Sequence, residues 1–255
     1  MNLMKISDIT SEIGFRLLTH GAAINRVEDT ICRIAAAYGM KADVFAIPSS
    51  LVLTITDSEL RTFTITRRVY YRDLNLDRVD MINTLAREIC RDKPDYTVVS
   101  QKLEEISSRP VYSQKMQLLA AAATSGGFAI LFGGGFPEAA AAAVIGIIVR
   151  WLFCKVEQLQ GGILLSNIIG GAACAFLSIL SQQLFAQLDP SVLTISTLML
   201  LVPGLTMTNS MRDLIAGDLV TGVMKATEAI IIATGIAIGV VFVLALSGTV
   251  AGVIL

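Results

Sequence analysis

Residues 161–185 read GGILLSNIIGGAACAFLSILSQQLF, a run without one acidic or basic side chain. The hydrocarbon core of a bilayer is about 30 Å thick, so a helix needs roughly 20 consecutive apolar residues to cross it. This run meets that length, and the Asp189-Pro190 pair that follows it is typical of a turn. The sequence therefore predicts a transmembrane helix over residues 161–185.

Other uncharged stretches of the C-terminal half are further candidates. The predicted spans are residues 116–135, 139–153, 161–185, 192–207 and 229–253. A Gly-Gly-Gly-Phe-Pro turn at 133–137 separates the first two spans, and Pro203-Gly204 interrupts the fourth. We therefore expect an all-α polytopic membrane domain of five transmembrane helices.

The distribution of charge divides the chain of 255 residues into two parts. Residues 1–115 hold 16 of the 20 Lys and Arg and 15 of the 21 Asp and Glu. Charged residues make up 16% of the chain, against roughly 25% in an ordinary soluble domain. We expect a polar domain at residues 1–112 and a domain embedded in the lipid bilayer at residues 113–255. The net charge of −1 gives no reason to expect a nucleic-acid partner.

Basic residues predict the orientation in the membrane. The first 30 residues are charged throughout and contain no apolar core of signal-peptide length, so we expect a cytoplasmic N-terminus. Five spans then place the C-terminus outside. The loops near Arg150 and Lys155 and near Arg212 and Lys225 fall on the cytoplasmic side, and the two outer connections contain no Lys or Arg. This arrangement follows the positive-inside rule for a multi-pass protein of the inner (plasma) membrane.

The polar domain has the sequence pattern of an α+β fold. Apolar residues recur with a helical period in four segments and alternate in three shorter ones. The predicted helices are 6–18, 24–38, 76–91 and 97–107, and the predicted strands are 43–47, 50–56 and 59–66. We expect two helices, a three-stranded meander and two more helices in one compact layer.

A helix-breaking pair interrupts the fourth predicted span. Pro203 removes a backbone donor and its ring clashes with the preceding turn, so carbonyls near residue 199 lose their partners. Such carbonyls are tolerated at membrane depth only when they are buried in protein or line an aqueous cavity. Transporters place their substrates at helix breaks of this kind. The candidate substrate-binding residues are Pro203, Gly204, Asn209, Arg212 and Asp218.

Two charged residues of this region each have a plainer alternative role. Arg212 can bind a carboxylate substrate, or it can form an ordinary ion pair with Asp213 or Asp218 in a cytoplasmic loop. Glu228 is the candidate coupling carboxylate at the mouth of the last span. It lies three residues after Lys225, so the two side chains can instead pair on one helix face.

Small residues are frequent in the predicted spans, and Gly235 and Gly239 form a GxxxG motif. In lipid, helices associate through close backbone approach at such residues. The motif therefore indicates tight packing within the chain or, alternatively, a face that meets another subunit of a homo-oligomer.

The sequence contains no motif for catalysis, metal binding or cofactor binding. The four cysteines contain no CxxC pair, and His20 is the only imidazole, so a tetrahedral zinc site is not expected. The GxSxG, HExxH, P-loop and GxGxxG patterns do not occur. We therefore expect no metal, no cofactor, no catalytic residue and no enzymatic activity. Without an ATP-binding motif, an ion or substrate gradient is the expected source of energy for any transport.

Three segments together resemble the threonine/serine exporter (ThrE) family. Residues 20–30, HGAAINRVEDT, resemble its N-terminal signature, and residues 49–54, SSLVLT, resemble the next block. Positions within 201–222, beginning with LVPG, resemble the membrane signature. The N-terminal positions that the resemblance marks are Gly21, Arg26 and Glu28.

The resemblance implies export of small carboxylate metabolites: threonine and serine in one branch, a dicarboxylate such as succinate in another. Full-length members of the family have a cytoplasmic N-terminal domain and about twice as many spans as predicted here. This chain is therefore similar to a YjjP-type half, which works with a second small membrane subunit of the YjjB type.

Two other hypotheses are compatible with the sequence. The chain can be a membrane-anchored hydrolase or metabolite sensor whose soluble domain carries the activity, or a scaffold subunit whose partner carries the whole pathway. One or two spans are enough for an anchor, so the larger predicted number favours the transport hypothesis.

Overall fold

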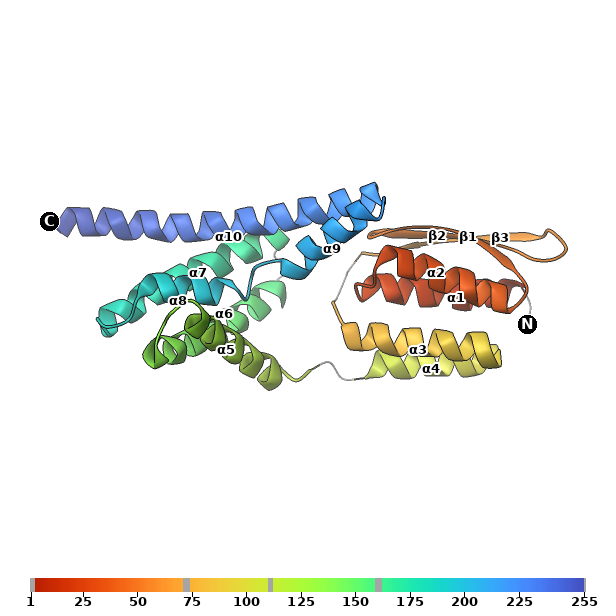
Figure 1. Cartoon of the computed structure of the whole chain (residues 1–255), viewed down its shortest axis with the longest axis horizontal. Coiled ribbons are helices and arrows are strands. Elements are labelled where there is room, and N and C mark those ends of the chain that lie inside the picture. Colours follow the sequence, from red (N-terminus) through yellow and green to blue (C-terminus); the bar gives the residue numbers. More distant parts are fainter. Residues whose placement is uncertain (1–2, 71–73, 110–111, 159–161, 255) are drawn as a thin grey trace. The chain divides into compact units, whose positions relative to one another are not determined.

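The computed structural model describes residues 3–70, 74–109, 112–158 and 162–254 (Figure 1). The chain forms two compact units. The first comprises Met1–Pro110 with the short segment Gly217–Thr221, and the second comprises Val111–Ala216 with Gly222–Leu255. The first unit contains the β-sheet, and the second is helical.

The first unit has four helices and three strands in its described residues. They are α1 (Leu3–Thr19), α2 (Ile24–Ala37), β1 (Lys41–Ile47), β2 (Ser50–Thr56), β3 (Thr62–Arg68), α3 (Leu76–Asp92) and α4 (Tyr96–Ser108). The strands form an antiparallel meander in the order β1-β2-β3. Helices α1 and α2 lie between the sheet and the α3–α4 pair, as Figure 1 shows. The predicted helices and meander are therefore confirmed, but they form three layers instead of one.

The core of this unit lies where α1 and α2 cover the sheet. On the central strand β2, Leu51, Leu53 and Ile55 are fully buried, while the side chains between them are partly exposed. Ile13 of α1 and Ile31 of α2 are buried in the same cluster. The period of two along the strand and the helical period along α1 and α2 thus bring one apolar face of each element together.

The third strand begins later than predicted. The prediction placed it at 59–66, but β3 runs from Thr62 to Arg68. The Asp57 carboxylate accepts hydrogen bonds from the backbone N–H groups of Glu59 and Arg61, both at 2.9 Å. An aspartate that bonds to following N–H groups in this way stabilises a turn, so the chain reverses before the strand starts.

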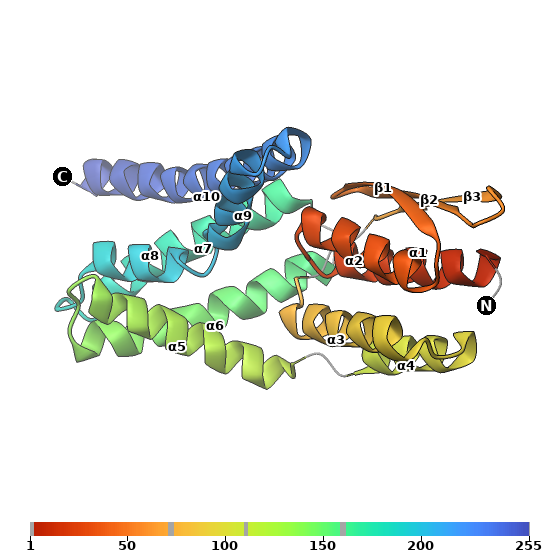
Figure 2. The same cartoon turned by 45° about the vertical axis from the view of Figure 1, so that its right-hand side comes forward.

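The second unit contains six helices in its described residues. They are α5 (Gln114–Leu131), α6 (Phe136–Gln158), α7 (Ile163–Leu184), α8 (Pro190–Leu198), α9 (Gly204–Ile215) and α10 (Leu219–Ile254). The first residues of α10, up to Thr221, are assigned to the first unit. Helices α5 and α6 pack side by side as a hairpin, and α8 contacts α5, α6 and α7 (Figure 2).

The prediction of five spans is wrong by the criteria of length and composition. Three of the described helices are long and apolar enough to cross a membrane: Phe136–Val156, Ile163–Leu184 and Leu219–Gly248. The predicted first span corresponds to α5, whose first turns contain Lys115 and Gln117. The predicted fourth span breaks into α8 and α9, each too short to cross. Gly161, the first residue of the predicted third span, lies outside the described residues.

The glycines of the GxxxG motif pack against α7 of the same chain. A β-carbon at Gly235 would lie 3.0 Å from the carbonyl oxygen of Leu164, and one at Gly239 would lie 2.7 Å from the backbone nitrogen of Ala172. From the other side, a β-carbon at Gly171 would lie 2.5 Å from the carbonyl oxygen of Ile236. The motif therefore serves tight packing within the chain, the first of the two predicted alternatives.

Candidate substrate-binding site

The break between α8 and α9 exposes backbone carbonyls. The helix stops at Leu198 and resumes at Gly204, with Pro203 at the N-terminal cap of α9. Among the residues that the structure describes, no backbone N–H donates to the carbonyl oxygens of Met199, Leu200 or Leu201. The prediction that carbonyls near residue 199 lose their partners is therefore confirmed.

This break borders a cavity of about 560 Å³ within the helical unit. Five helices and the break contribute to its wall. The lining residues are Gln117, Ala120, Ala121, Thr124, Arg150, Phe153, Ile163, Asn167, Leu200, Leu201, Pro203, Thr206 and Ile232. Most of this wall is apolar, and a few polar groups converge on it, which is the usual composition of a small-molecule site.

Arg150 is the one charged residue among the described lining residues of this cavity. It lies on α6, and its Nη2 donates a hydrogen bond to Oε1 of Gln117 on α5, at 2.8 Å. A guanidinium group has five N–H donors, so most of its donors stay available for a ligand. The paired N–H groups of arginine match the two oxygens of a carboxylate.

Neutral polar groups add to this positive charge. Asn167 on α7 is buried, and its Nδ2 donates to the carbonyl oxygen of Ile163 at 2.7 Å, which leaves its side-chain oxygen as an acceptor. Thr124 of α5 and Thr206 of α9 bring hydroxyl groups to the same wall. The cavity can therefore hold a carboxylate at Arg150 and place acceptors near an ammonium or hydroxyl group of the same molecule.

The five predicted substrate-binding residues separate in the structure. Pro203 lines the cavity, whereas Gly204, Asn209, Arg212 and Asp218 are not among its lining residues. Arg212 is exposed and lies 3.4 Å from the carboxylate of Asp213, so the plainer alternative of an ion pair is present. The Asp218 carboxylate accepts a hydrogen bond from the backbone N–H of Thr221 at 3.2 Å, which caps the start of α10.

A buried ion pair joins α9 to α10. Nζ of Lys225 lies 2.7 Å from the carboxylate of Asp213, and both side chains are almost inaccessible to solvent. Beside this pair, Oγ of Ser210 donates to the carbonyl oxygen of Gly222 at 2.8 Å. Lys225 thus pairs with Asp213 of the neighbouring helix.

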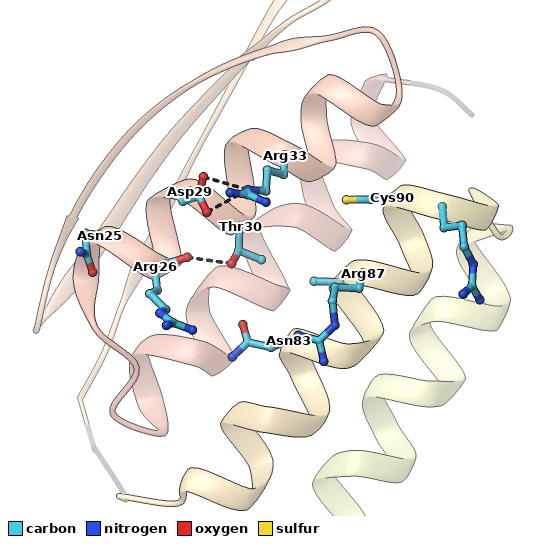
Figure 3. A pocket seen from close by; sticks show the side chains of 10 residues that line it. Asn25, Arg26, Asp29, Thr30, Arg33, Asn83, Arg87 and Cys90 are labelled. Atoms are coloured by element: carbon cyan, nitrogen blue, oxygen red, sulfur yellow. Dashed lines mark hydrogen bonds and ion pairs between the residues drawn. The ribbon is translucent and has the colours of Figure 1, made fainter.

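The three N-terminal motif residues have separate surroundings. Gly21 adopts a φ of +84° in the turn between α1 and α2, a conformation that glycine adopts without strain. Glu28 turns towards the sheet and accepts a hydrogen bond from the backbone N–H of Ala46 at 3.0 Å. Partial burial raises the pKa of this carboxyl above its ordinary value. Arg26 points the other way, into a groove beside α3 (Figure 3).

Sequence reasoning did not name Arg150 as a candidate and used it only to orient the chain. Its signal was its position within the long apolar helix α6, inside the candidate span Phe136–Val156. Ionisable residues at such positions are costly to bury and usually mark a functional site.

No group of three or more His, Cys, Asp or Glu side chains suitable for a metal ion occurs in the part of the chain that the structure describes. The cysteines Cys32, Cys90, Cys154 and Cys174 are all free thiols.

Comparison with known families matches most of the chain to a family of exporters. The model of the family described as "Putative threonine/serine exporter" (ThrE) matches residues 8–247. Neither a curated protein nor a solved structure matches the chain. The matched range includes the N-terminal motif, the helix break and the cavity residues, and the apolar helices agree with a membrane protein. The chain belongs to the threonine/serine exporter family.

Proposed function

We propose that this chain is a subunit of an inner-membrane secondary exporter for small carboxylate metabolites, either threonine and serine or a dicarboxylate such as succinate. Membership of an exporter family supports transport as the function and does not favour the alternative of a membrane-anchored hydrolase or sensor. The substrate class is the one that the resemblance implies, and the chemistry of the cavity supports it.

The single observation that carries this proposal is Arg150 in the wall of the cavity beside the α8–α9 break. A lone guanidinium in an apolar cavity attracts an anionic group strongly, because few water molecules compete for its donors. Leu200 and Leu201 line the same cavity, and their carbonyl oxygens, which receive no backbone hydrogen bond in the described residues, can accept from an ammonium or a hydroxyl group. Threonine, serine and short dicarboxylates all carry a carboxylate of suitable size.

The cavity lies at the basic end of the α5–α6 hairpin. Lys115 is in the first turn of α5 and Lys155 is in the last turn of α6, and Arg150 lies five residues before Lys155. The bond between Gln117 and Arg150 joins these two helix ends. By the positive-inside rule, we place this end at the cytoplasmic side, together with the N-terminal unit. A cavity at that end is suited to loading substrate from the cytoplasm.

A second small membrane subunit of the YjjB type is the proposed partner. Ile163 lines the cavity, yet 45% of its surface is exposed within this chain. A partner helix on that side can cover the cavity, and this would complete the substrate pathway.

Reconstitution of the chain with its partner subunit in vesicles tests the binding role. We expect Arg150→Gln to lower the rate of threonine or succinate transport by about tenfold or more, since it removes a charge-assisted bond. Arg150→Lys keeps the charge but loses the bidentate geometry, so it should recover only part of the rate. Arg212→Gln is the matched control, because Arg212 is exposed and outside the cavity. Loss of transport in Arg212→Gln with normal transport in Arg150→Gln contradicts the proposal.

Glu228 is the proposed coupling carboxylate. It lies on α10, within the candidate span Leu219–Gly248. We expect Glu228→Gln to retain substrate binding and to lose the dependence of transport on the proton gradient. A Glu228→Gln rate equal to that of the unsubstituted chain at each of several proton gradients would exclude this role.

A further inference from the structure

A groove of about 790 Å³ runs between α2 and α3 of the N-terminal unit (Figure 3). Both helices belong to one compact unit and pack against each other. The lining residues are Asn25, Arg26, Asp29, Thr30, Arg33, Asn83, Ala86, Arg87, Cys90 and Arg91. Four of these are arginines and one is an aspartate, so the groove has an excess of positive charge.

The one aspartate is already neutralised. Asp29 lies 2.8 Å from Nε of Arg33, one helical turn further along α2. Outside the groove lining, Asp92 accepts two hydrogen bonds from Arg91, both at 2.9 Å. Arg33 and Arg91 therefore have acidic partners, and no carboxylate of the groove lining remains for Arg26 and Arg87.

The remaining two arginines have no acidic partner among the described residues. Arg26 makes no ion pair, and Arg87 donates only to the hydroxyl of Thr84, at 2.7 Å. Figure 3 shows Arg26 of α2 and Arg87 of α3 on opposite sides of Asn83. Two like charges that face one concave site repel each other, and an anion bound between them removes that repulsion.

Neutral groups of the groove favour a specific ligand over diffuse counter-ions. The amides of Asn25 and Asn83 offer both donors and acceptors, and Ala86 supplies a buried apolar floor. Burial raises the pKa of the Cys90 thiol, so this side chain stays neutral and does not offset the arginines.

We infer that the groove between α2 and α3 binds a small dianion, with one anionic group at Arg26 and Asn83 and the other at Arg87. Guanidinium groups bind carboxylates and phosphates by the same paired N–H geometry, so a dicarboxylate and a diphosphate group share the required chemistry. A zwitterion such as threonine does not fit, because the one carboxylate available for its ammonium is already held by Arg33. The groove shares no lining residue with the membrane cavity, and the inference that it binds a dianion does not rest on the proposed transport function.

The test measures binding to the purified full chain that carries Arg150→Gln, so that the membrane cavity contributes little. The probes are succinate and inorganic pyrophosphate, with threonine as the zwitterionic control, in titration calorimetry at 0.15 M salt. We compare the double variant Arg26→Gln/Arg87→Gln with the charge-matched double variant Lys41→Gln/Arg68→Gln, whose residues lie on exposed strand positions outside the groove. Glutamine is a good helix former, so the helices should persist.

We expect one of the two anions to bind, and the groove variant to weaken that binding by about tenfold or more while the control variant binds like the parent. Succinate or pyrophosphate as the tighter ligand then identifies the source of the dianion. A local readout is alkylation of Cys90, which the ligand should slow severalfold, while Cys32 outside the groove reacts at an unchanged rate. Equal binding by the two double variants, or no binding of either anion, overturns the proposal.

Discussion

Gly239 of α10 packs against the backbone of α7, and alanine at this position tests the contact. The added β-carbon would lie 2.7 Å from the backbone nitrogen of Ala172 and would overlap the carbonyl oxygen of Ile168. Van der Waals contact between such atoms begins at about 3.5 Å, so the two helices must separate by on the order of 1 Å. Both obstacles are backbone atoms, and no side-chain rotation relieves the clash.

The expected loss of stability in Gly239→Ala follows from this geometry. An extra methyl group in a packed interior costs typically about 1–3 kcal/mol, and we expect about 3 kcal/mol here because the backbones themselves must move. Gly248 of the same helix is the matched control, since a β-carbon there meets no atom of the described residues within 4 Å. Alanine is the better helix former, so Gly248→Ala should leave stability unchanged or raise it by less than about 1 kcal/mol.

Thermal unfolding of the detergent-purified chain, followed by size-exclusion chromatography after heating, measures both effects. A loss of 3 kcal/mol corresponds to a midpoint lower by about 6–12 °C for a protein of this size. Gly248→Ala should unfold at or slightly above the midpoint of the unsubstituted chain. Equal midpoints for the two variants would refute the reasoning, because they would mean that α7 and α10 do not pack through backbone contact at Gly239.

Two further substitutions test other parts of the structure. Glu28→Gln keeps an acceptor for the Ala46 N–H and removes a carboxyl whose pKa is raised by burial. The Glu28 carboxyl stabilises the fold while it is protonated, and this contribution is lost as the pH rises through its raised pKa in the folded state. Above the ordinary pKa of a glutamate, Glu28→Gln should therefore become more stable relative to the unsubstituted chain, by less than about 1 kcal/mol. Thermal melts at several pH values measure the difference. Lys225→Met leaves the buried Asp213 carboxylate with only Arg212 at 3.4 Å, so it should lower the stability by about 3 kcal/mol. Adding Asp213→Asn removes the buried charge and should recover most of that stability. A double variant as unstable as Lys225→Met alone would contradict this.

The sequence predicted most of the N-terminal unit because its elements are amphipathic. A helix or strand that faces water on one side repeats its apolar residues at the period of its backbone, so α2 and β2 were predicted to within one residue and α1 to within three. Where the prediction shifted, a local hydrogen bond decided the boundary. Asp57 stabilises the turn before β3 by accepting hydrogen bonds from two backbone N–H groups. Such a side-chain hydrogen bond competes with the hydrogen bonds of the sheet, and it leaves no periodic pattern in the sequence.

The helical unit was harder to predict because its helices have no polar side to mark a period. Uncharged length was the main guide, and it misplaced the end of a continuous helix and the end of an interrupted one. Helix α6 begins at Phe136 and continues to Gln158, beyond the predicted end at residue 153. Helix α8 stops at Leu198, because the chain turns before Pro203. Hydrogen bonding, rather than the absence of charge, sets where a helix ends.

The same boundary error explains why the candidate site was only partly predicted. A second span that ends at residue 153 places Arg150 in its last turn, where a basic residue signals only the cytoplasmic side. In the structure, α6 continues past Arg150, and the guanidinium lies against Gln117, 33 positions earlier in the sequence. Pro203 was predicted because a broken helix has a local signature, whereas the wall opposite it is assembled from helices far apart in sequence. Arg212 had the right chemistry in the right segment, but α9 turns it towards Asp213 and solvent. A charge inside a continuous apolar helix is therefore the stronger indicator of a site in this chain than a charge beside a helix break.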